Sequence, residues 1–546
     1  MTKYKTQQDN GVKGTGPLAD GSEGAGATCS DRRQSLPSLD QDGIEEGSLD
    51  LALLREVSLT YARGNMMLPV RREGDTLKAF VCGNQGIFAL HELARTMGLK
   101  PVAIKVQEGR LLELINHAYG MIGSAAEVMS DIAEGDFDSV ARTFQSPRDI
   151  LELTEDAPII RLLNALLQQA VKENASDIHI EPYEKELIVR LRIDGMLRKI
   201  LTPPKIIQEA LISRIKIMAD LDIAEKRLPQ DGRIRLLVGS KDVDVRVSII
   251  PSSFGERAVL RLLDRKRGLI GLDQLGMSEQ CQRSLNHMLR SPHGIILVTG
   301  PTGSGKTTTL YAALNSIYSD EKNIITIEDP VEYQMKGIGQ INVNHKIGLT
   351  FAAGLRSILR HDPDIIMVGE IRDLETAEIA IQASLTGHLV FSTLHTNDAA
   401  SAITRLVDMG VEPFLIASSI VGVLAQRLLR KVCMSCMQKY TPSSVERDYF
   451  STDVTQPKML SRGVGCDKCN HTGYSGRIGI FEILTIDGEV VSLIDKNVDY
   501  TRIKTHAVNT GMTTLRADGL SKAAEGITTL EEVLRVTQKD HADISI

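Results

Sequence analysis

The sequence lacks any apolar run long enough to cross a membrane. No stretch of about 18 apolar residues occurs, so no transmembrane helix is predicted. The N-terminus, residues 1–10, is polar and lacks the apolar block that follows the charged start of a signal peptide. We therefore expect a cytoplasmic protein.

Excess positive charge and a disulfide framework are also missing. Lys and Arg number 63 against 70 Asp and Glu, so the formal net charge is -7 and gives no general support for nucleic-acid binding. Aromatic residues form only 4% of the chain, so a basic groove studded with aromatic side chains is not indicated either. The seven cysteines are odd in number and spread along a long chain, unlike the framework of a small secreted protein.

What the sequence does contain is the composition of a globular protein with several domains. The chain of 546 residues is 42% hydrophobic and 24% charged. This length predicts roughly three or four domains. Residues 1–48 carry eight glycines and a single aromatic residue, Tyr4, so they are predicted to form a disordered tail.

Apolar periodicity divides the rest of the chain into three folded parts. Two α+β domains are predicted first, at 49–120 and 155–265, separated by an acidic linker at 121–154. A second linker at 266–275 leads to a part that continues to residue 546, in which strands and helices alternate. Such alternation is typical of a parallel sheet with crossover helices.

Individual elements of the two smaller domains are also predicted. The first has a strand at 77–82 and a helix at 88–97. The second opens with a helix whose candidate N-cap is Asp156. Alternating strands of the second domain are expected at 176–181, 187–193, 243–250 and 258–263.

The strongest motif is a complete P-loop between a predicted strand at 294–298 and a predicted helix at 308–317. Its glycines let backbone N–H groups turn toward phosphates, and the helix N-terminus adds partial positive charge. Lys306 is expected to reach the β and γ phosphates of ATP, and Thr307 to hold magnesium. The expected nucleotide-binding residues are Gly300, Pro301, Thr302, Gly303, Ser304, Gly305, Lys306, Thr307 and Thr308.

Two further predicted strands run into acids. The strand 324–327 is followed by Glu328, and the strand 365–368 leads through Gly369 into Glu370. Because ligands of open α/β sheets lie at the carboxyl ends of the strands, these acids are expected to converge on the P-loop. One would hold magnesium through water while the other positions the attacking water, and the assignment of the two roles stays open. Either acid alone would be equally consistent with a solvated strand end.

Histidines and arginines near these motifs are further candidates. His388 precedes the apolar run 389–391 and His395 follows it, where a side chain could sense the γ-phosphate; a purely structural role is the alternative for each. Arginine can neutralise transition-state charge on a phosphoryl group, even from another domain or subunit. The candidate arginines are Arg233, Arg246, Arg356, Arg360 and Arg372, with surface ion pairs favoured for Arg356 and Arg360.

Four cysteines form two C-x-x-C pairs separated by 29 residues. Each pair can grip one tetrahedral ion, and four soft ligands close the site, so a structural zinc is predicted. The expected ligands are Cys433, Cys436, Cys466 and Cys469. Cys29, Cys82 and Cys281 lack such spacing and are interpreted as incidental.

The ordered set of motifs resembles that of the secretion and pilus-assembly ATPase superfamily. After the P-loop come Ile-Glu-Asp-Pro-Val-Glu at 327–332, Val-Gly-Glu-Ile-Arg-Asp at 368–373, and a histidine box at 386–397. Within the superfamily the chain resembles the type II secretion ATPases, also called protein E of the general secretion pathway. Supporting segments lie at 175–181, 229–233, 255–257, 425–428 and 476–479.

The resemblance implies a fold and roles for individual residues. The fold is α/β, a RecA-like P-loop ATPase domain with a zinc-binding subdomain at about 431–472, preceded by two smaller α+β domains, of which 155–265 is PAS-like and closes over the nucleotide. Glu328 would position the water and Glu370 would lie near magnesium. Arg233 and Arg246 would close from the adjacent domain. His388 and His395 would couple the site to movement.

The resemblance also implies cofactors, partners and a place in the cell. ATP, Mg2+ and Zn2+ are the expected cofactors, and a homohexamer is the expected assembly. Residues 49–120 would bind a membrane-anchored inner-membrane protein, and the ring would act on a polytopic platform protein. The ATPase would then sit peripherally at the inner membrane and power assembly of a pilin-like filament and protein export.

Other classes of ATPase carry some of the same motifs and are the alternatives. A type IV pilus assembly ATPase carries the same boxes, but paired Arg-Leu-Gly motifs typical of some of its members are absent from residues 49–120. A pilus-retraction ATPase normally lacks the paired cysteines. From other classes, a DNA-handling RecA-like enzyme is disfavoured by the charge balance, and an ATP-gated scaffold would not need the full hydrolytic set of side chains.

Overall fold

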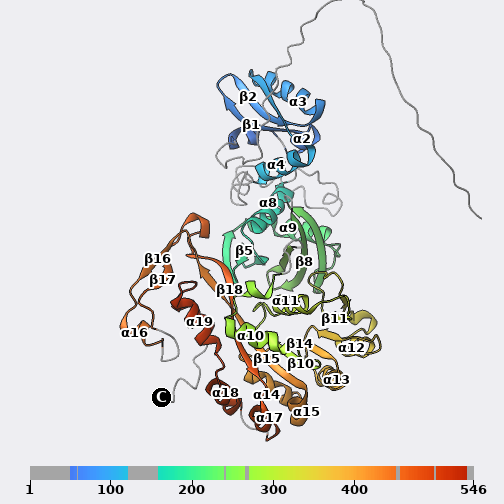
Figure 1. Ribbon diagram of the computed structural model, residues 1–546. Helices are drawn as coiled ribbons and strands as arrows, with labels where there is room; N and C mark the ends of the chain where they lie inside the picture. The colour runs from blue at the N-terminus through green and yellow to red at the C-terminus, as the bar shows by residue number, and fades with distance from the viewer. Residues whose placement is uncertain are drawn as a thin grey trace, which may run out of the picture.

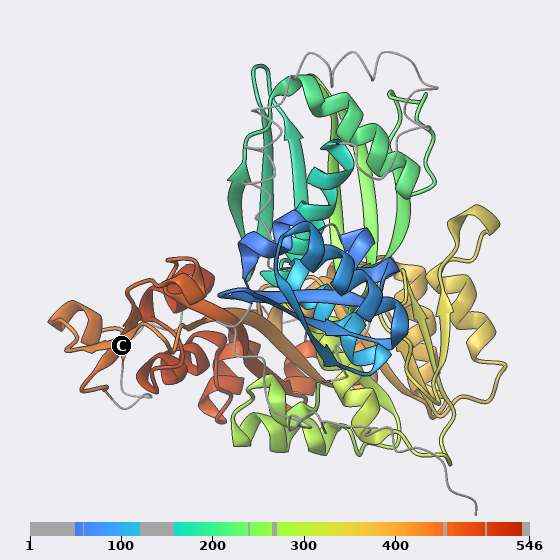
Figure 2. The ribbon, with the colours of Figure 1, turned by 90° about the horizontal axis from the view of Figure 1, so that it is seen from above.

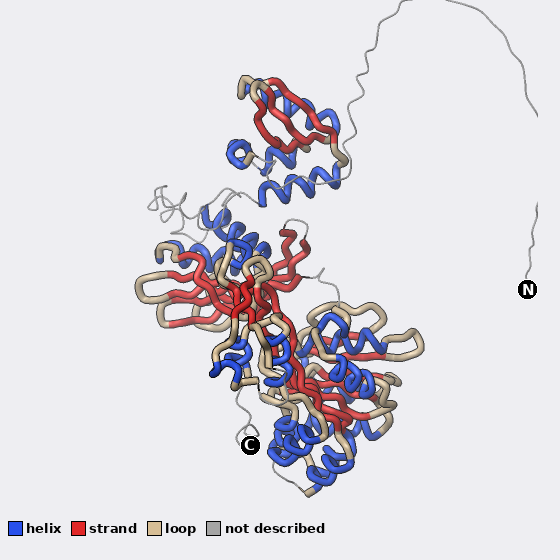
Figure 3. The backbone as a smooth tube through the Cα atoms, turned by 60° about the vertical axis from the view of Figure 1, so that its left-hand side comes forward, coloured by secondary structure: helices blue, strands red, loops and turns tan. Residues whose placement is uncertain are grey.

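The computed structural model describes residues 50–57, 59–120, 158–238, 241–264, 270–450, 456–496 and 500–537. Three folded parts follow one another along the chain, each with its own sheet (Figures 1 and 3). The tail expected at 1–48 and the linker expected at 121–154 lie outside the described residues. Among the described helices, none has the length and apolar character required to cross a membrane.

The first folded part is a small α+β domain. Its elements are α1 (Leu51–Glu56), α2 (Leu59–Gly64), β1 (Met67–Glu73), β2 (Thr76–Val81), α3 (Gly83–Thr96), β3 (Lys100–Lys105) and α4 (Glu108–Gly120). The strands lie in the order β1-β2-β3, with β1 antiparallel and β3 parallel to β2. Leu77 and Val81 alternate toward the core, where Leu90 of α3 packs on them, so the predicted strand and helix are confirmed.

The second folded part is a six-stranded antiparallel sheet with two helices on one face (Figure 2). Its elements are α8 (Pro158–Lys172), β4 (Asp177–Pro182), β5 (Leu187–Ile193), β6 (Met196–Leu201), the 3-10 helix η1 (Lys205–Ile207), α9 (Gln208–Met218), β7 (Gln230–Val238), β8 (Lys241–Ser252) and β9 (Gly255–Asp264). The order is β6-β5-β4-β9-β8-β7. The four predicted strands are confirmed, while β6 and β7 carry too many charged residues for their alternation to be recognised.

Alternation along β4 explains why this sheet has one apolar and one polar face. Ile178 and Ile180 belong to the core formed with Leu162 and Leu166 of α8. Asp177 and the other odd-numbered residues of the strand point to the opposite face. Asp156, the predicted N-cap of α8, lies outside the described residues.

The third folded part is built on a seven-stranded sheet in the order β12-β11-β13-β14-β10-β15-β18. Its strands are β10 (Gly294–Thr299), β11 (Ile324–Glu328), β12 (Gly339–Asn342), β13 (Ile365–Val368), β14 (Leu389–Leu394), β15 (Ile420–Val432) and β18 (Tyr474–Thr485). All neighbours are parallel except the last pair, β15 and β18. The predicted parallel sheet is therefore confirmed.

Helices cover both faces of this sheet. They are α10 (Glu279–Met288), α11 (Lys306–Ile317), α12 (Phe351–Ile358), α13 (Leu374–Leu385), α14 (Ala400–Asp408) and α15 (Pro413–Ser419). Two apolar cores result, one containing α13 and α14 and the other α10 and α11. The predicted linker 266–275 ends in the 3-10 helix η2 (Leu272–Leu275), whose leucines pack into the second core.

The C-terminal region extends the sheet on one side. Strands β15 and β18 run on past the sheet as a two-stranded ribbon, and the four cysteines lie at its far end beside β16 (Met437–Tyr440) and β17 (Leu460–Gly463). The remaining helices are α16 (Ser444–Arg447), η4 (Asp467–Cys469), α17 (Gly488–Asp495), α18 (Tyr500–Asn509), α19 (Leu515–Ala524) and α20 (Leu530–Val536). Helices α19 and α20 pack against β15 and β18.

Candidate active site

The P-loop turns sharply between β10 and α11 and packs against Gln426 of β15. Gly300 and Gly305 both have positive φ angles, 146° and 92°, which side-chain-bearing residues rarely adopt. A Cβ atom on Gly300 would lie 2.4 Å from the carbonyl oxygen of Gln426. Thr309 Oγ1 donates to Gln426 Oε1 at 2.6 Å and so fixes the first turn of α11 on the sheet.

Lys306 and Ser304 give this loop the groups that a phosphate needs. Lys306 Nζ donates to the carbonyl oxygens of Gly300 and Pro301 at 2.8 and 3.3 Å, and burial lowers the pKa of this amine while Glu370 opposes the shift. The Ser304 hydroxyl is buried and, among the described residues, has no hydrogen-bond partner. A buried donor without a protein partner fits an anionic ligand seated in the loop.

Glu370 lies between Arg372 and His395 at the carboxyl end of β13. Arg372 Nη2 donates to Glu370 Oε1 at 2.6 Å, and His395 Nε2 lies 3.5 Å from Glu370 Oε2. Burial raises the pKa of Glu370, but the Arg372 hydrogen bond and the charges of Arg372 and Lys306 outweigh it, so the net shift is downward. Burial lowers the pKa of His395, and Lys306 lowers it further. Near neutral pH, Glu370 is therefore a carboxylate and His395 is neutral.

Glu328 ends the neighbouring strand β11 in very different surroundings. Its side chain is buried, and its carboxylate accepts hydrogen bonds from Thr326 Oγ1 at 2.6 Å, Tyr311 Oη at 2.5 Å and Gln340 Nε2 at 3.3 Å. Burial raises the pKa of Glu328 above its usual value, although these three hydrogen bonds oppose the shift. Sequence reasoning missed Tyr311 and Gln340, and the tyrosine hydroxyl within the predicted helix 308–317 was the one available signal.

Arginines of the second domain face the loop that follows Glu328. Arg246 of β8 pairs with Glu332 at 2.9 Å and donates to the carbonyl oxygen of Val331 at 3.3 Å. Arg233 of β7 is the cross-strand neighbour of Arg246. These two arginines line a cleft of roughly 480 Å³ whose other wall includes Asp329. By contrast, Arg356 forms an exposed ion pair with Glu375 at 2.7 Å, as favoured from the sequence.

The two histidines of the histidine box lie at opposite ends of β14. His395 follows the strand and faces Glu370. His388 precedes it beside Gly294, the first residue of β10, so it lies at the amino ends of these strands, opposite to the P-loop. Its Nδ1 lies 2.8 Å from the carbonyl oxygen of Ala383 at the end of α13. The structure thus brings Lys306, Glu370 and His395 together and leaves His388 apart.

The four cysteines form a compact cluster. Three pairs of sulfur atoms lie 3.8 to 3.9 Å apart, and all four sulfurs lie within 4.8 Å of one another. Zn–S bonds of about 2.3 Å in a tetrahedron require sulfurs about 3.8 Å apart, so the cluster fits zinc. Backbone N–H groups of Cys466 and Gly473 donate to Cys469 Sγ at 3.2 and 3.3 Å, which favours a thiolate there.

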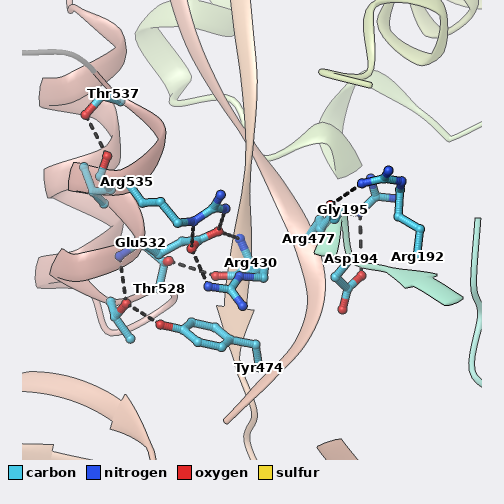
Figure 4. Close-up of polar contacts among 12 residues, drawn as sticks. Arg192, Asp194, Gly195, Arg430, Tyr474, Arg477, Thr528, Glu532, Arg535 and Thr537 are labelled. Atoms are coloured by element: carbon cyan, nitrogen blue, oxygen red, sulfur yellow. Dashed lines mark hydrogen bonds and ion pairs between the residues drawn. The ribbon is translucent and has the colours of Figure 1, made fainter. Parts of the chain in front are cut away.

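The second domain touches the chain directly after this cluster. Asp194, in the turn between β5 and β6, accepts a hydrogen bond from the Gly476 N–H at 2.9 Å and pairs with Arg477 (Figure 4). Asn470 Nδ2 donates to Glu173 Oε2 at 3.0 Å. The second domain is therefore held at two places, the Asp329–Glu332 loop and the start of β18.

Comparison with known proteins gives close relatives over most of the chain. Residues 152–535 match the family described as Type II/IV secretion system protein. The chain is 52% identical to the type II secretion system protein E of Pseudomonas aeruginosa, over 83% of this chain and 90% of that protein. It is 54% identical to the type II secretion system ATPase E of Vibrio cholerae, over 76% of this chain and 83% of that protein.

A solved structure supports the fold class. The DotB ATPase of Yersinia pseudotuberculosis aligns with a TM-score of 0.52 over 69% of this chain and 93% of that one. At 20% sequence identity this likeness shows the fold alone. The predicted fold class, an α/β chain with a RecA-like P-loop domain, is confirmed.

Proposed function

The chain belongs to the Type II/IV secretion system protein family, and from this premise we propose that it is the motor ATPase of a type II secretion system. It converts ATP and water to ADP and phosphate and uses the energy to assemble a short pilin-like filament that drives protein export. The observation that carries the proposal is that Lys306, Glu370 and His395 lie together at the carboxyl ends of the strands, beside a P-loop.

The residues at the carboxyl ends of these strands have distinct tasks in hydrolysis. Lys306 and the P-loop N–H groups bind the phosphates and neutralise charge that develops on them. Thr307 and the ionised Glu370 would hold Mg2+, which supplies further positive charge to the phosphates when bound. Glu328, with its raised pKa, accepts a hydrogen bond from the attacking water and orients it.

The second domain and His395 link hydrolysis to movement. Arg233 and Arg246 approach the phosphates when the domain closes over the Asp329–Glu332 loop. His395 responds to the nucleotide through Glu370 and passes the change along its own segment. His388, bonded to the end of α13, would take part only through β14. The four cysteines hold Zn2+ in a structural site away from the chemistry.

The assembly and its partners are part of the same proposal. We propose a homohexamer peripheral to the inner membrane on the cytoplasmic side. The domain at 50–120 would bind the membrane-anchored docking protein, and the ring would act on the polytopic platform protein.

Magnesium-dependent ATP hydrolysis by the full chain tests the enzymatic part of this proposal. We expect turnover that rises when the cytoplasmic part of the docking protein and lipid are added. Lys306→Ala should abolish it, whereas Glu375→Gln, in an exposed ion pair of α13, should leave it unchanged. Turnover of the unaltered chain no higher than that of Lys306→Ala under every condition would favour an ATP-gated scaffold instead.

A further inference from the structure

Glu482 of β18 is a fully enclosed carboxylate that joins the beginnings of two helices. Its side chain is 1% exposed. Oε1 accepts a hydrogen bond from the N–H of Ala399 at 2.9 Å, and Oε2 accepts one from the N–H of Leu515 at 3.2 Å. Ala399 is the N-cap of α14 and Leu515 is the first residue of α19, so both partners are donors that a helix leaves unpaired.

The surroundings of Glu482 are charged but do not neutralise it directly. Burial raises the pKa of this carboxyl to about 7, while the two backbone hydrogen bonds and Lys504 oppose the shift and Asp398 adds to it. Lys504 of α18 is itself paired with Asp398 at 3.2 Å. The charges of Asp398 and Glu482 also act on Arg427 of β15, where they oppose the lowering of its pKa by burial. Burying a carboxyl group is costly unless hydrogen bonds compensate, and here the two backbone N–H groups supply them. The carboxyl group therefore ties the beginnings of the two helices together.

One of its two partners belongs to the segment that carries His395. We name residues 395–399 the His395 segment. At its start, the N–H of Thr396 donates to Thr299 Oγ1 at 2.9 Å, and Thr299 is the residue that precedes the P-loop. At its end, the N–H of Ala399 donates to Glu482. The His395 segment is thus held between the P-loop strand and β18.

We propose that Glu482 is a positioning residue for ATP hydrolysis, which holds the end of the His395 segment and passes its movement to α19. This inference rests on the proposed ATPase function. When His395 responds to the nucleotide, the displacement reaches Ala399, then the carboxylate, then the first turn of α19. Helix α19 also packs on β17 of the four-cysteine region, so the signal leaves the nucleotide site toward the C-terminal surface.

A second buried carboxylate of the same region provides a matched control. Glu532 of α20 is 0% exposed, and it accepts a hydrogen bond from the Arg430 N–H at 3.1 Å and pairs with the side chains of Arg430 and Arg535 (Figure 4). It ties α20 to β15 through Arg430, whereas the contact of β15 with the His395 segment is made by Arg427, which donates to Asn397 Oδ1 at 2.9 Å. A purely structural role would make Glu482 and Glu532 equivalent in activity measurements.

The experiment compares Glu482→Gln and Glu532→Gln in the full chain, with kcat, KM and the affinity for a non-hydrolysable ATP analogue as readouts. The amide keeps one acceptor but turns an N–H group toward the other backbone donor. We expect Glu482→Gln to lower kcat about 10-fold with KM and analogue affinity within about 2-fold of the unaltered chain. Glu532→Gln should lower the melting temperature and keep kcat. Equal kcat for the two variants would overturn the inference.

A fluorescence reporter covers the case in which Glu482→Gln fails to fold. The chain contains no tryptophan, so Tyr449→Trp introduces a single reporter against Arg516 of α19, whose guanidinium lies 5.7 Å from the Tyr449 ring centre. The ATP analogue should change its emission in the chain with Glu482 in place, and in a folded Glu482→Gln chain the change should disappear. No response while the analogue is bound would overturn the inference, whereas absence of turnover in the unaltered chain would refute the proposed function itself.

Discussion

The carboxyl ends of β11 and β13 place two glutamates side by side in opposite electrostatic settings. Glu328 is surrounded by neutral hydroxyl and amide donors, and its pKa is raised by burial. Glu370 is surrounded by Arg372, His395 and Lys306, and its pKa is lowered by Arg372 and Lys306 against the effect of burial. Both acids follow the same apolar-strand pattern, so position at a strand end does not decide the role. The neighbours of each carboxylate set its charge, and this difference supports the proposed roles, water orientation for Glu328 and magnesium binding for Glu370.

Replacing Glu328 tests the first half of this comparison and should have the largest effect. Glu328→Gln removes an acceptor that general-base chemistry uses, so kcat should fall about 1,000-fold. Nucleotide affinity, measured with a fluorescent analogue, should change little because Lys306 and the P-loop are untouched. A normal kcat with weakened nucleotide binding would reverse the two assignments.

Replacing Glu370 tests the second half. Glu370→Gln should lower kcat about 100-fold at a fixed magnesium concentration, since a carboxylate near the phosphates is lost. Titration with magnesium should recover part of the loss for this variant and none for Glu328→Gln. Equal magnesium dependence of the two variants would break the comparison.

Tyr311→Phe alters the surroundings of Glu328 and leaves those of Glu370 unchanged, although the hydroxyl it removes also accepts a hydrogen bond from the Glu332 N–H at 3.3 Å. Loss of the hydroxyl donor removes one of the hydrogen bonds that hold the pKa of Glu328 down, so this pKa should rise further. Because the working form is deprotonated, the acid limb of the kcat profile should move to higher pH. At neutral pH we expect a loss of about 10-fold. A profile that moves to lower pH would contradict this sign.

Arg372→Ala makes the corresponding change at Glu370. Without the guanidinium the pKa of Glu370 should rise toward its usual value, which still leaves it ionised at neutral pH. Because Arg372 is largely exposed, the ion pair is weak and kcat should fall only about 3-fold. A decrease larger than that of Tyr311→Phe would show that Arg372 itself contacts the phosphates.

Cys466→Ser should leave both acids undisturbed and have the smallest effect on turnover. Three thiolates hold zinc less well than four, so bound zinc and the melting temperature should both decrease. We expect kcat to stay within about 2-fold, because the cluster lies at the far end of the β15–β18 ribbon. Loss of ATP binding in this variant would argue against a separate structural site.

The parts predictable from the sequence are those set by neighbours along the chain. The P-loop, the strands that end in Glu328 and Glu370, and the two cysteine pairs are each contained in a short segment. The contacts that distinguish the two acids are not: Gln340 lies 12 residues from Glu328 and Tyr311 lies 17 residues away. Which strands are neighbours fixes these contacts, and local patterns do not report it.

The partners of residues far apart along the chain could not be predicted from the sequence for the same reason. Arg246 lies 86 residues from Glu332, and Glu482 lies 83 residues from Ala399. His388 and His395 share one motif, yet they lie seven residues apart on either side of β14, which places their backbones about 23 Å apart. The resemblance assigned both histidines to coupling with movement, whereas the strand places only His395 beside Glu370.

The long strand β15 connects the P-loop to the distant cysteine cluster. Gln426 supports the P-loop at one point of this strand, and Cys433 follows just past its end, seven residues further on. At a rise of about 3.3 Å per residue, the cysteine cluster lies about 23 Å from the pivot, so a tilt of about 10° at Gln426 would swing it through about 4 Å. Because β18 is hydrogen-bonded along β15, the two strands would move together, and a small rotation beside the nucleotide would become a larger displacement of the cysteine cluster.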